Sequence, residues 1–269
     1  MANKVRLVDL SVEIKEGIGE TPPAEKMDPK LIELLSAKIV YEDHSVGTHH
    51  MLRIFQGITQ EDLPDGLGWA GEILTLVSHS GTHMDAPYHY HPTSEGKRAK
   101  TIDEVPLDWC YANGVVLDMT HKKPGELIHS ADIREALRKI DYELKPLDIV
   151  LVRTDTDKLW DTMRYWTDQP GMSREGTIWL ADQGVKVMGI DAPGWDRPFP
   201  YQTSEFLKTK DRSLIWEGHF AGIEREYFQM EKLANLDQLP PFGFKVSCFP
   251  IKILKAGAAW VRPVAIIEE

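Results

Sequence analysis

Two short β-branched runs, separated by an amphipathic segment, constrain the fold of this chain more than any other feature. The runs GVVLDMT (114–120) and DIVLVRTDT (148–156) are typical of buried strands. Between them, SADIREALRKID (130–141) begins with a serine that we expect to cap a helix, and its apolar residues recur on one helical face. Residues 177–193 then repeat helix, glycine and strand. This alternation predicts an α/β fold.

The 269 residues carry no internal repeat and no glycine-rich phosphate motif, so we expect one α/β domain spanning residues 1–269. Residues 43–71 have many glycines and aspartates and little periodicity, which predicts an irregular loop. Residues 161–174 resemble an inserted loop that could cover a site. Residues 225–240 predict a short helix or a loop, followed by closing strands.

Composition and charge exclude several kinds of partner. The net charge of −11 disfavours nucleic acid and anionic membrane surfaces, and no apolar run approaches the ~20 residues that span a bilayer. No signal peptide is evident at the start, so a cytoplasmic location is expected. The only two cysteines, Cys110 and Cys248, fit small buried apolar residues. A bound metal would therefore need nitrogen and oxygen ligands.

The segment SHSGTHMDAPYHYHP (78–92) concentrates four of the ten histidines. In an extended chain alternate residues share a face, which places His79, His83 and Asp85 together. Gly81 lies between them and would have to bend the chain, because four extended residues separate their ends by ~13 Å. Two imidazoles and a carboxylate suit Zn²⁺, Mn²⁺ or Fe²⁺ and leave a position open for water. The alternative is a polar loop of hydrogen-bonded histidines.

Beyond its spacing, the stretch HSGTHMDAPYH (79–89) resembles the HxGTHxDxPxH signature of the cyclase-like metal-dependent hydrolases. That family includes bacterial kynurenine formamidases, isatin hydrolase and enzymes that open lactones or cyclic amides. The opening strand around VRLVDLSVEI and the element ending in LANLDQLP (233–240) are also similar to the family pattern. The resemblance implies a swivelling β/β/α fold built on a mixed sheet, and a homo-oligomer, either a dimer or a tetramer.

By position, the resemblance implies that His79, His83 and Asp85 bind the first metal and that His89 is the general acid and base. His219 and Glu231, twelve residues apart, match the pair that completes a second metal site in the formamidase-like members. The 161–174 insertion looks more like the isatin-hydrolase side, where one Mn²⁺ suffices. The number of ions, one or two, therefore stays open. Without the resemblance, Glu231 fits a solvated helix residue and His219 a hydrogen-bonded structural histidine.

The activity implied is hydrolysis of an amide or ester carbonyl in a small molecule, such as an aryl formamide, a cyclic amide or a lactone, by a metal-activated water. Six aromatic residues could bind an aromatic substrate or could belong to the core: Trp69, Trp160, Trp166, Trp179, Trp195 and Phe199. Two alternatives remain: a non-catalytic protein that binds a metal or ligand on the same fold, and a lyase or cyclase that acts without net hydrolysis.

Overall fold

A computed structural model of the chain describes residues 4–17 and 29–268. The chain divides into two compact units: the larger combines the segment up to Ile14 with Ser78 and everything after it, and the smaller is Lys15–Val77. No helix among the described residues has the length and apolar character needed to cross a membrane.

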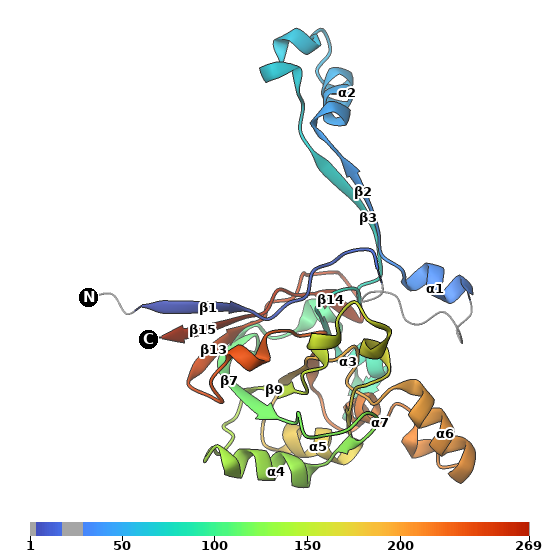
Figure 1. The fold of residues 1–269 in the computed structure, drawn as a ribbon, viewed down its shortest axis with the longest axis vertical. Coiled ribbons are helices and arrows are strands. Elements are labelled where there is room, and N and C mark those ends of the chain that lie inside the picture. Colours follow the sequence, from blue (N-terminus) through green and yellow to red (C-terminus); the bar gives the residue numbers. More distant parts are fainter. Residues whose placement is uncertain (1–3, 18–28, 269) are drawn as a thin grey trace. The chain divides into compact units, whose positions relative to one another are not determined.

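A nine-stranded mixed sheet organises the larger unit (Figure 1). The strand order is β1-β15-β13-β7-β9-β11-β12-β4-β14. The four strands β7, β9, β11 and β12 run parallel, and their neighbours on both sides are antiparallel. The strands are β1 (Val5–Asp9), β4 (His83–Asp85), β7 (Tyr111–Asp118), β9 (Ile149–Arg153), β11 (Val187–Ile190), β12 (Phe228–Glu231), β13 (Phe244–Ser247), β14 (Ala258–Trp260) and β15 (Val264–Glu268).

Short helices and two small ribbons complete the larger unit. The helices are α3 (Pro87–Tyr90), α4 (Ser130–Lys139), α5 (Arg174–Asp182), α6 (Phe199–Thr209) and α7 (Glu217–Phe220). The ribbons pair β5 (Thr93–Ser94) with β6 (Lys97–Arg98) and β8 (Leu127–Ile128) with β10 (Gly171–Met172).

Alternating side chains divide the core between the two faces of the sheet. All nine strands contribute to one buried cluster, so the sheet curls around it, and Met84 of β4 and Met230 of β12 belong to this inner cluster. Residues between these positions face outward, where α4 and α5 cover β7 and β9 (Figure 1). Asp85 and the residues next to Met230 therefore lie on the outer, helix-covered face.

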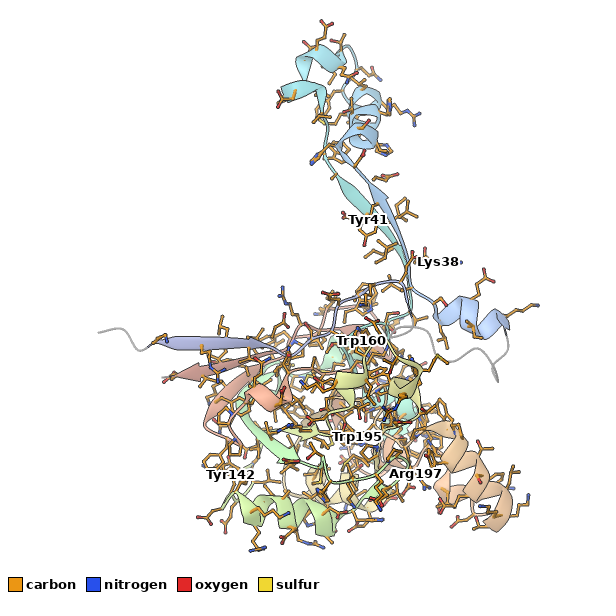
Figure 2. All side chains as sticks on the ribbon, in the orientation of Figure 1. Lys38, Tyr41, Tyr142, Trp160, Trp195 and Arg197 are labelled. Atoms are coloured by element: carbon orange, nitrogen blue, oxygen red, sulfur yellow. The ribbon has the colours of Figure 1, made fainter. Side chains whose placement is uncertain are left out.

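The smaller unit contains α1 (Pro29–Leu35), the antiparallel pair β2 (Lys38–Glu42) and β3 (Gly71–Thr75), and α2 (His44–Ile54). Tyr41 on β2 is 73% exposed and is labelled in Figure 2. The prediction of an irregular loop over 43–71 is wrong, because α2 occupies much of it. The Asp43 side chain accepts hydrogen bonds from the N–H groups of Ser45 and Val46 and so caps a helix that buries only Gly47 and Thr48.

Several sequence predictions are confirmed, including the α/β class, the mixed sheet and the β7-α4-β9-α5-β11 alternation. The helix cap differs by one residue: His129 is the N-cap, and its N–H donates to the Asp132 side chain. Residues 225–240 contain the strand β12 rather than only a helix or loop, because β11 and β4 pair with it on both sides. Cys110 and Cys248 are buried free thiols, as predicted. The single domain over 1–269 and the insertion at 161–174 stay predictions.

Candidate metal centre

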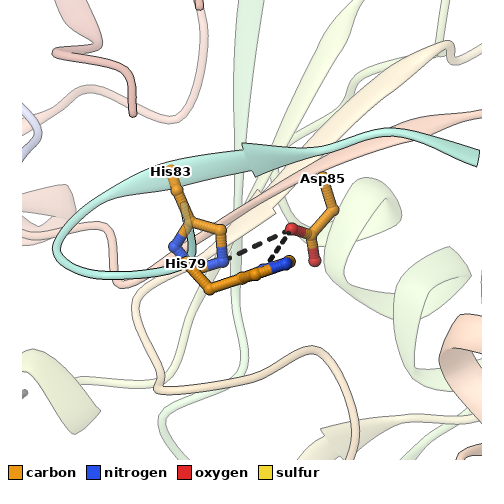
Figure 3. Close-up of side chains that lie close together, drawn as sticks. All are labelled: His79, His83 and Asp85. Atoms are coloured by element: carbon orange, nitrogen blue, oxygen red, sulfur yellow. Dashed lines mark ion pairs between the residues drawn. The ribbon is translucent and has the colours of Figure 1, made fainter. Parts of the chain in front are cut away.

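The loop before β4 brings the first histidine back toward the strand. Gly81 has φ +59, a left-handed conformation that glycine adopts without strain, and the chain reverses there. As a result His79 Nδ1 lies 2.9 Å from Asp85 Oδ1, and His83 Nε2 lies 3.4 Å from the same oxygen (Figure 3). The three side chains predicted to share a face therefore converge on one carboxylate oxygen.

The His83 ring is held in one tautomer. Its Nδ1 lies 2.9 Å from the Gly81 carbonyl oxygen, which can only accept, so Nδ1 carries the proton. Burial lowers the pKa of His83, which keeps the ring neutral and leaves a lone pair on Nε2. Both Nε2 and the facing Asp85 Oδ1 are buried and make no hydrogen bond of good geometry among the described residues, although His79 Nδ1 lies 2.9 Å from Oδ1. Two buried acceptors that face each other suit a cation.

Helix α3 positions His89 on the other side of the same carboxylate. Pro87 occupies its first turn, where the missing N–H costs nothing. His89 Nε2 lies 3.8 Å from Asp85 Oδ2, and its ring centre lies 4.2 Å from that of His79. Burial lowers the pKa of His89 to about 4, against the opposing charge of Asp85, so the ring is neutral at pH 7 and can accept a proton.

Helix α7 contributes His219, which Asp196 orients. The Asp196 carboxylate accepts hydrogen bonds from the backbone N–H groups of Gly218 and His219 and from His219 Nδ1. This leaves Nε2 directed at the cluster, 3.7 Å from Asp85 Oδ2 and 3.2 Å from Glu231 Oε1. Trp216 stacks on the ring at 4.1 Å between centres.

Strand β12 adds Gln229 and Glu231, which point to the same face two residues apart. The Gln229 amide nitrogen lies 2.8 Å from His219 Nε2, 2.8 Å from Glu231 Oε1 and 3.4 Å from Asp85 Oδ2. Glu231 Oε1 also accepts from the backbone N–H of Trp195 at 2.8 Å. Its other oxygen, Oε2, lies 3.6 Å from His83 Nε2.

The ring nitrogens around Asp85 and Glu231 favour the ionised form of both carboxylates, and burial lowers the pKa of His79 but Asp85 raises it above its ordinary value overall. Burial opposes the charge of Asp85, but His89, His79 and His83 bring the pKa of Asp85 well below its ordinary value. Burial and the charge of Asp85 likewise oppose ionisation of Glu231, yet His219 lowers its pKa overall. Two buried negative charges are costly to keep away from water, and a divalent cation bound between them would neutralise them.

The protonation of His219 is set by opposing contacts. Burial opposes its charge, while Asp196, Asp85 and Glu231 raise the pKa of His219 well above the ordinary value. A protonated Nε2 would place two donors face to face with the Gln229 amide nitrogen at 2.8 Å. The contact with Gln229 instead fits a neutral ring, in which Nδ1–H donates to Asp196 and Nε2 accepts from the Gln229 amide.

All six residues predicted for the site lie in this one cluster: His79, His83, Asp85, His89, His219 and Glu231. Their roles as metal ligands and as proton-transfer base stay predictions. His91 is outside the cluster, with its ring nitrogen against Thr93. The sequence interpretation missed Gln229, Asp196 and Trp216. Alternation with Glu231 on a strand would have indicated Gln229.

The aromatic residues divide between core and surface. Trp195 is fully buried in the larger unit (Figure 2), and its indole N–H donates to Thr177. Trp69 and Phe199 are 44% and 69% exposed. Two other aromatic rings contact the cluster: Trp216 stacks on His219 and makes a T-shaped contact with His89 at 5.2 Å, and Tyr90 makes a T-shaped contact with His219 at 5.5 Å.

Comparison with known proteins locates related sequences over most of the chain. A family model described as putative cyclase matches residues 8–197, which include the 79–89 signature. The kynurenine formamidase of Erythrobacter litoralis is 30% identical over 199 residues, covering 73% of this chain and 76% of that protein. The isatin hydrolase of Roseibium aggregatum is 25% identical over 222 residues, covering 76% and 78%.

Solved structures share the fold. An isatin hydrolase bound to the product analogue thioisatinate has a TM-score of 0.73 at 20% identity, covering 98% of this chain and 93% of that chain. Isatin hydrolase A from Labrenzia aggregata, bound to benzyl benzoate, has a TM-score of 0.71 at 21% identity, covering 98% and 94%.

Proposed function

Because this chain belongs to the cyclase family, we propose that it is a metal-dependent hydrolase that cleaves an amide or ester carbonyl in a small molecule. The observation that carries the proposal is the pair of buried acceptors, His83 Nε2 and Asp85 Oδ1, which face each other at 3.4 Å. The relatives named kynurenine formamidase and isatin hydrolase support an aryl formamide, a cyclic amide or a lactone as the substrate class.

His79, His83 and Asp85 would hold the metal, and His219 and Glu231 complete the cluster. A set of nitrogen and oxygen ligands suits Zn²⁺ or Mn²⁺. When bound, the metal supplies Lewis acidity to the attacking water and to the substrate carbonyl. A homo-oligomeric state and a cytoplasmic location remain predictions.

His89 would move the proton. Its neutral ring accepts a proton from the attacking water and returns it to the leaving nitrogen or oxygen, which balances the hydrolysis. Asp85 Oδ2 lies 3.8 Å from Nε2 and stabilises the imidazolium that forms. Trp216 packs against the same ring in a T-shaped contact, with 5.2 Å between the ring centres.

The test is metal analysis of the purified protein, followed by a hydrolysis screen against N-formyl aryl amines, isatin and small lactones. We expect bound metal and products that have gained one water, with activity lost on chelation and restored by Zn²⁺ or Mn²⁺. Bound metal without turnover of any substrate class would favour the non-catalytic alternative, and products without added water would favour a lyase. Protein that binds neither ion would contradict the proposal.

A further inference from the structure

Two groups of possible ligands share Asp85, but their surroundings differ. We call His79, His83 and Asp85 Oδ1 the open side, and His89, His219 and Asp85 Oδ2 the closed side. The ligand atoms within each group lie within 4.8 Å of one another, so distance alone would allow an ion on each side. The difference lies in the hydrogen-bond donors that reach each group.

We propose that the Gln229 side-chain amide takes the place of a second cation on the closed side, so that the centre holds one ion, on the open side. This inference rests on the proposed function, because it assumes that the open side binds a metal. In this proposal Gln229 limits the centre to one ion, although Glu231 could serve as a ligand of a second ion.

The Gln229 amide contacts the groups that a second ion would need. Its nitrogen lies within hydrogen-bond reach of His219 Nε2, Glu231 Oε1 and Asp85 Oδ2. Gln229 is fully buried and enters from β12, directly opposite Asp85 in the strand register. A cation on the closed side would have to displace this amide from a packed position.

The amide orientation follows from its neighbours. The reversed orientation would place the amide oxygen 2.8 Å from Glu231 Oε1 and 3.4 Å from Asp85 Oδ2, where all of these atoms are acceptors. With the nitrogen there, the N–H groups face acceptors only. The amide thus supplies partial positive charge where a second ion would supply full charge.

On the open side, the group that approaches Asp85 Oδ1 is an imidazole nitrogen, His79 Nδ1 at 2.9 Å, rather than an amide. His83 Nε2 and Asp85 Oδ1 make no hydrogen bond of good geometry among the described residues. Glu231 repeats the asymmetry: Oε1 accepts from Gln229 and the Trp195 N–H, while Oε2 faces His83. The Gln229 side-chain oxygen also has no hydrogen-bond partner among the described residues, so this amide is held by its nitrogen alone.

The third nearby carboxylate, Asp196, is already occupied by His219 and two backbone N–H groups. Both of its oxygens therefore accept hydrogen bonds already, and a second ion would have to displace them to use this carboxylate.

The experiment is titration of the chelator-treated full chain with Zn²⁺ and with Mn²⁺, read by calorimetry and by metal content after desalting. We expect one equivalent for the wild type. Gln229→Glu removes the amide donor and adds a carboxylate, so we expect two equivalents. Adding His219→Ala to that variant should restore one equivalent, because the second ion would lose a ligand.

Circular dichroism establishes that each variant is folded. If Gln229→Glu does not fold, Gln229→Ala serves instead, and a second, weaker equivalent is expected because the donor is gone and the acceptors remain. Two equivalents in the wild type, or one equivalent in every folded Gln229 variant, would overturn the inference and leave the proposed function standing. A wild type that binds no ion would instead contradict the proposed function.

Discussion

Two histidines of the same cluster show how one protein can keep one ligand atom free and occupy another. His83 and His219 each use Nδ1 to hold the ring and direct Nε2 at Asp85. In His83 the holding group is a backbone carbonyl two residues away, and Nε2 has no partner among the described residues. In His219 the holding group is Asp196, and Nε2 meets the Gln229 amide.

The difference follows from where each residue lies in the fold. His83 belongs to β4, next to a glycine turn whose own carbonyl fixes the ring, so its orientation is a local property. His219 belongs to a four-residue helix and is oriented by groups from two other segments, Asp196 and Gln229. The comparison indicates that the side of Asp85 facing His83 binds the metal, while the side facing His219 is occupied by the Gln229 amide and binds no metal.

The largest effect should come from His83→Ala. This change removes a buried ligand atom from the open side, and we expect metal content to fall from one equivalent to near zero, with loss of all metal-dependent activity. Metal analysis after desalting is the measurement. The matched control is His91→Ala, whose ring contacts Thr93 outside the cluster and which should keep full metal content. Unchanged metal content in the His83 variant would remove it from the ligand set.

His89→Ala should separate chemistry from metal binding. We expect turnover to fall by ~10²–10⁴-fold because proton transfer is lost, while metal content stays at the wild-type value. Steady-state kinetics on an active substrate and metal analysis of the same sample check both parts. If metal is retained and turnover stays near wild type, His89 is not the proton carrier; if metal is lost, it belongs to the ligand set.

The sequence predicts the part of the cluster that depends on neighbouring residues in the chain, the side that contains His83. Period-two alternation placed His79, His83 and Asp85 on one face, and Gly81 between them indicated the turn. The buried strands β7 and β9 are equally clear, because each contains a short apolar run that includes β-branched residues. These features depend on neighbours in the chain, and such features can be predicted from one sequence.

The side that contains His219 depends on contacts between residues that are distant in the sequence. Asp196 lies 23 residues from His219, and Gln229 lies 144 residues from Asp85. Residues 225–240 predict a helix or loop, but pairing on both sides with β11 and β4 makes β12 a strand. Without that strand, Gln229 and Glu231 cannot be placed on one face.

Asp196→Asn should affect stability rather than metal binding. The asparagine has one acceptor oxygen for donors that now use two, so a buried donor loses its partner at a cost of about 1–3 kcal/mol in the free energy of unfolding. Urea denaturation is the measurement, with metal content expected to stay unchanged. A double-mutant cycle with Gln229→Met tests the link: coupling through His219 predicts non-additive losses, whereas additive losses would argue that Asp196 and Gln229 act independently.

The smallest expected effect concerns Asp191, a buried carboxylate outside the cluster. It tests whether a buried carboxylate without histidines beside it stays protonated, in contrast to Asp85. Asp191 is fully buried and accepts from Thr154 and from the Asp155 N–H; burial, with the charge of Asp157, raises the pKa of Asp191 to about 7. Its folded pKa exceeds the unfolded value of ~3.9, so the folded chain binds the extra proton between the two values. The stabilisation is complete below pH ~4 and is lost as pH rises through about 7. Asp191→Asn should flatten this decline in urea denaturation across the window, whereas Asp182→Asn, an exposed partner of Arg225, should keep the wild-type slope. An unchanged slope in Asp191→Asn would mean that this carboxylate is ionised like Asp85, and that burial without histidines does not set the difference between them.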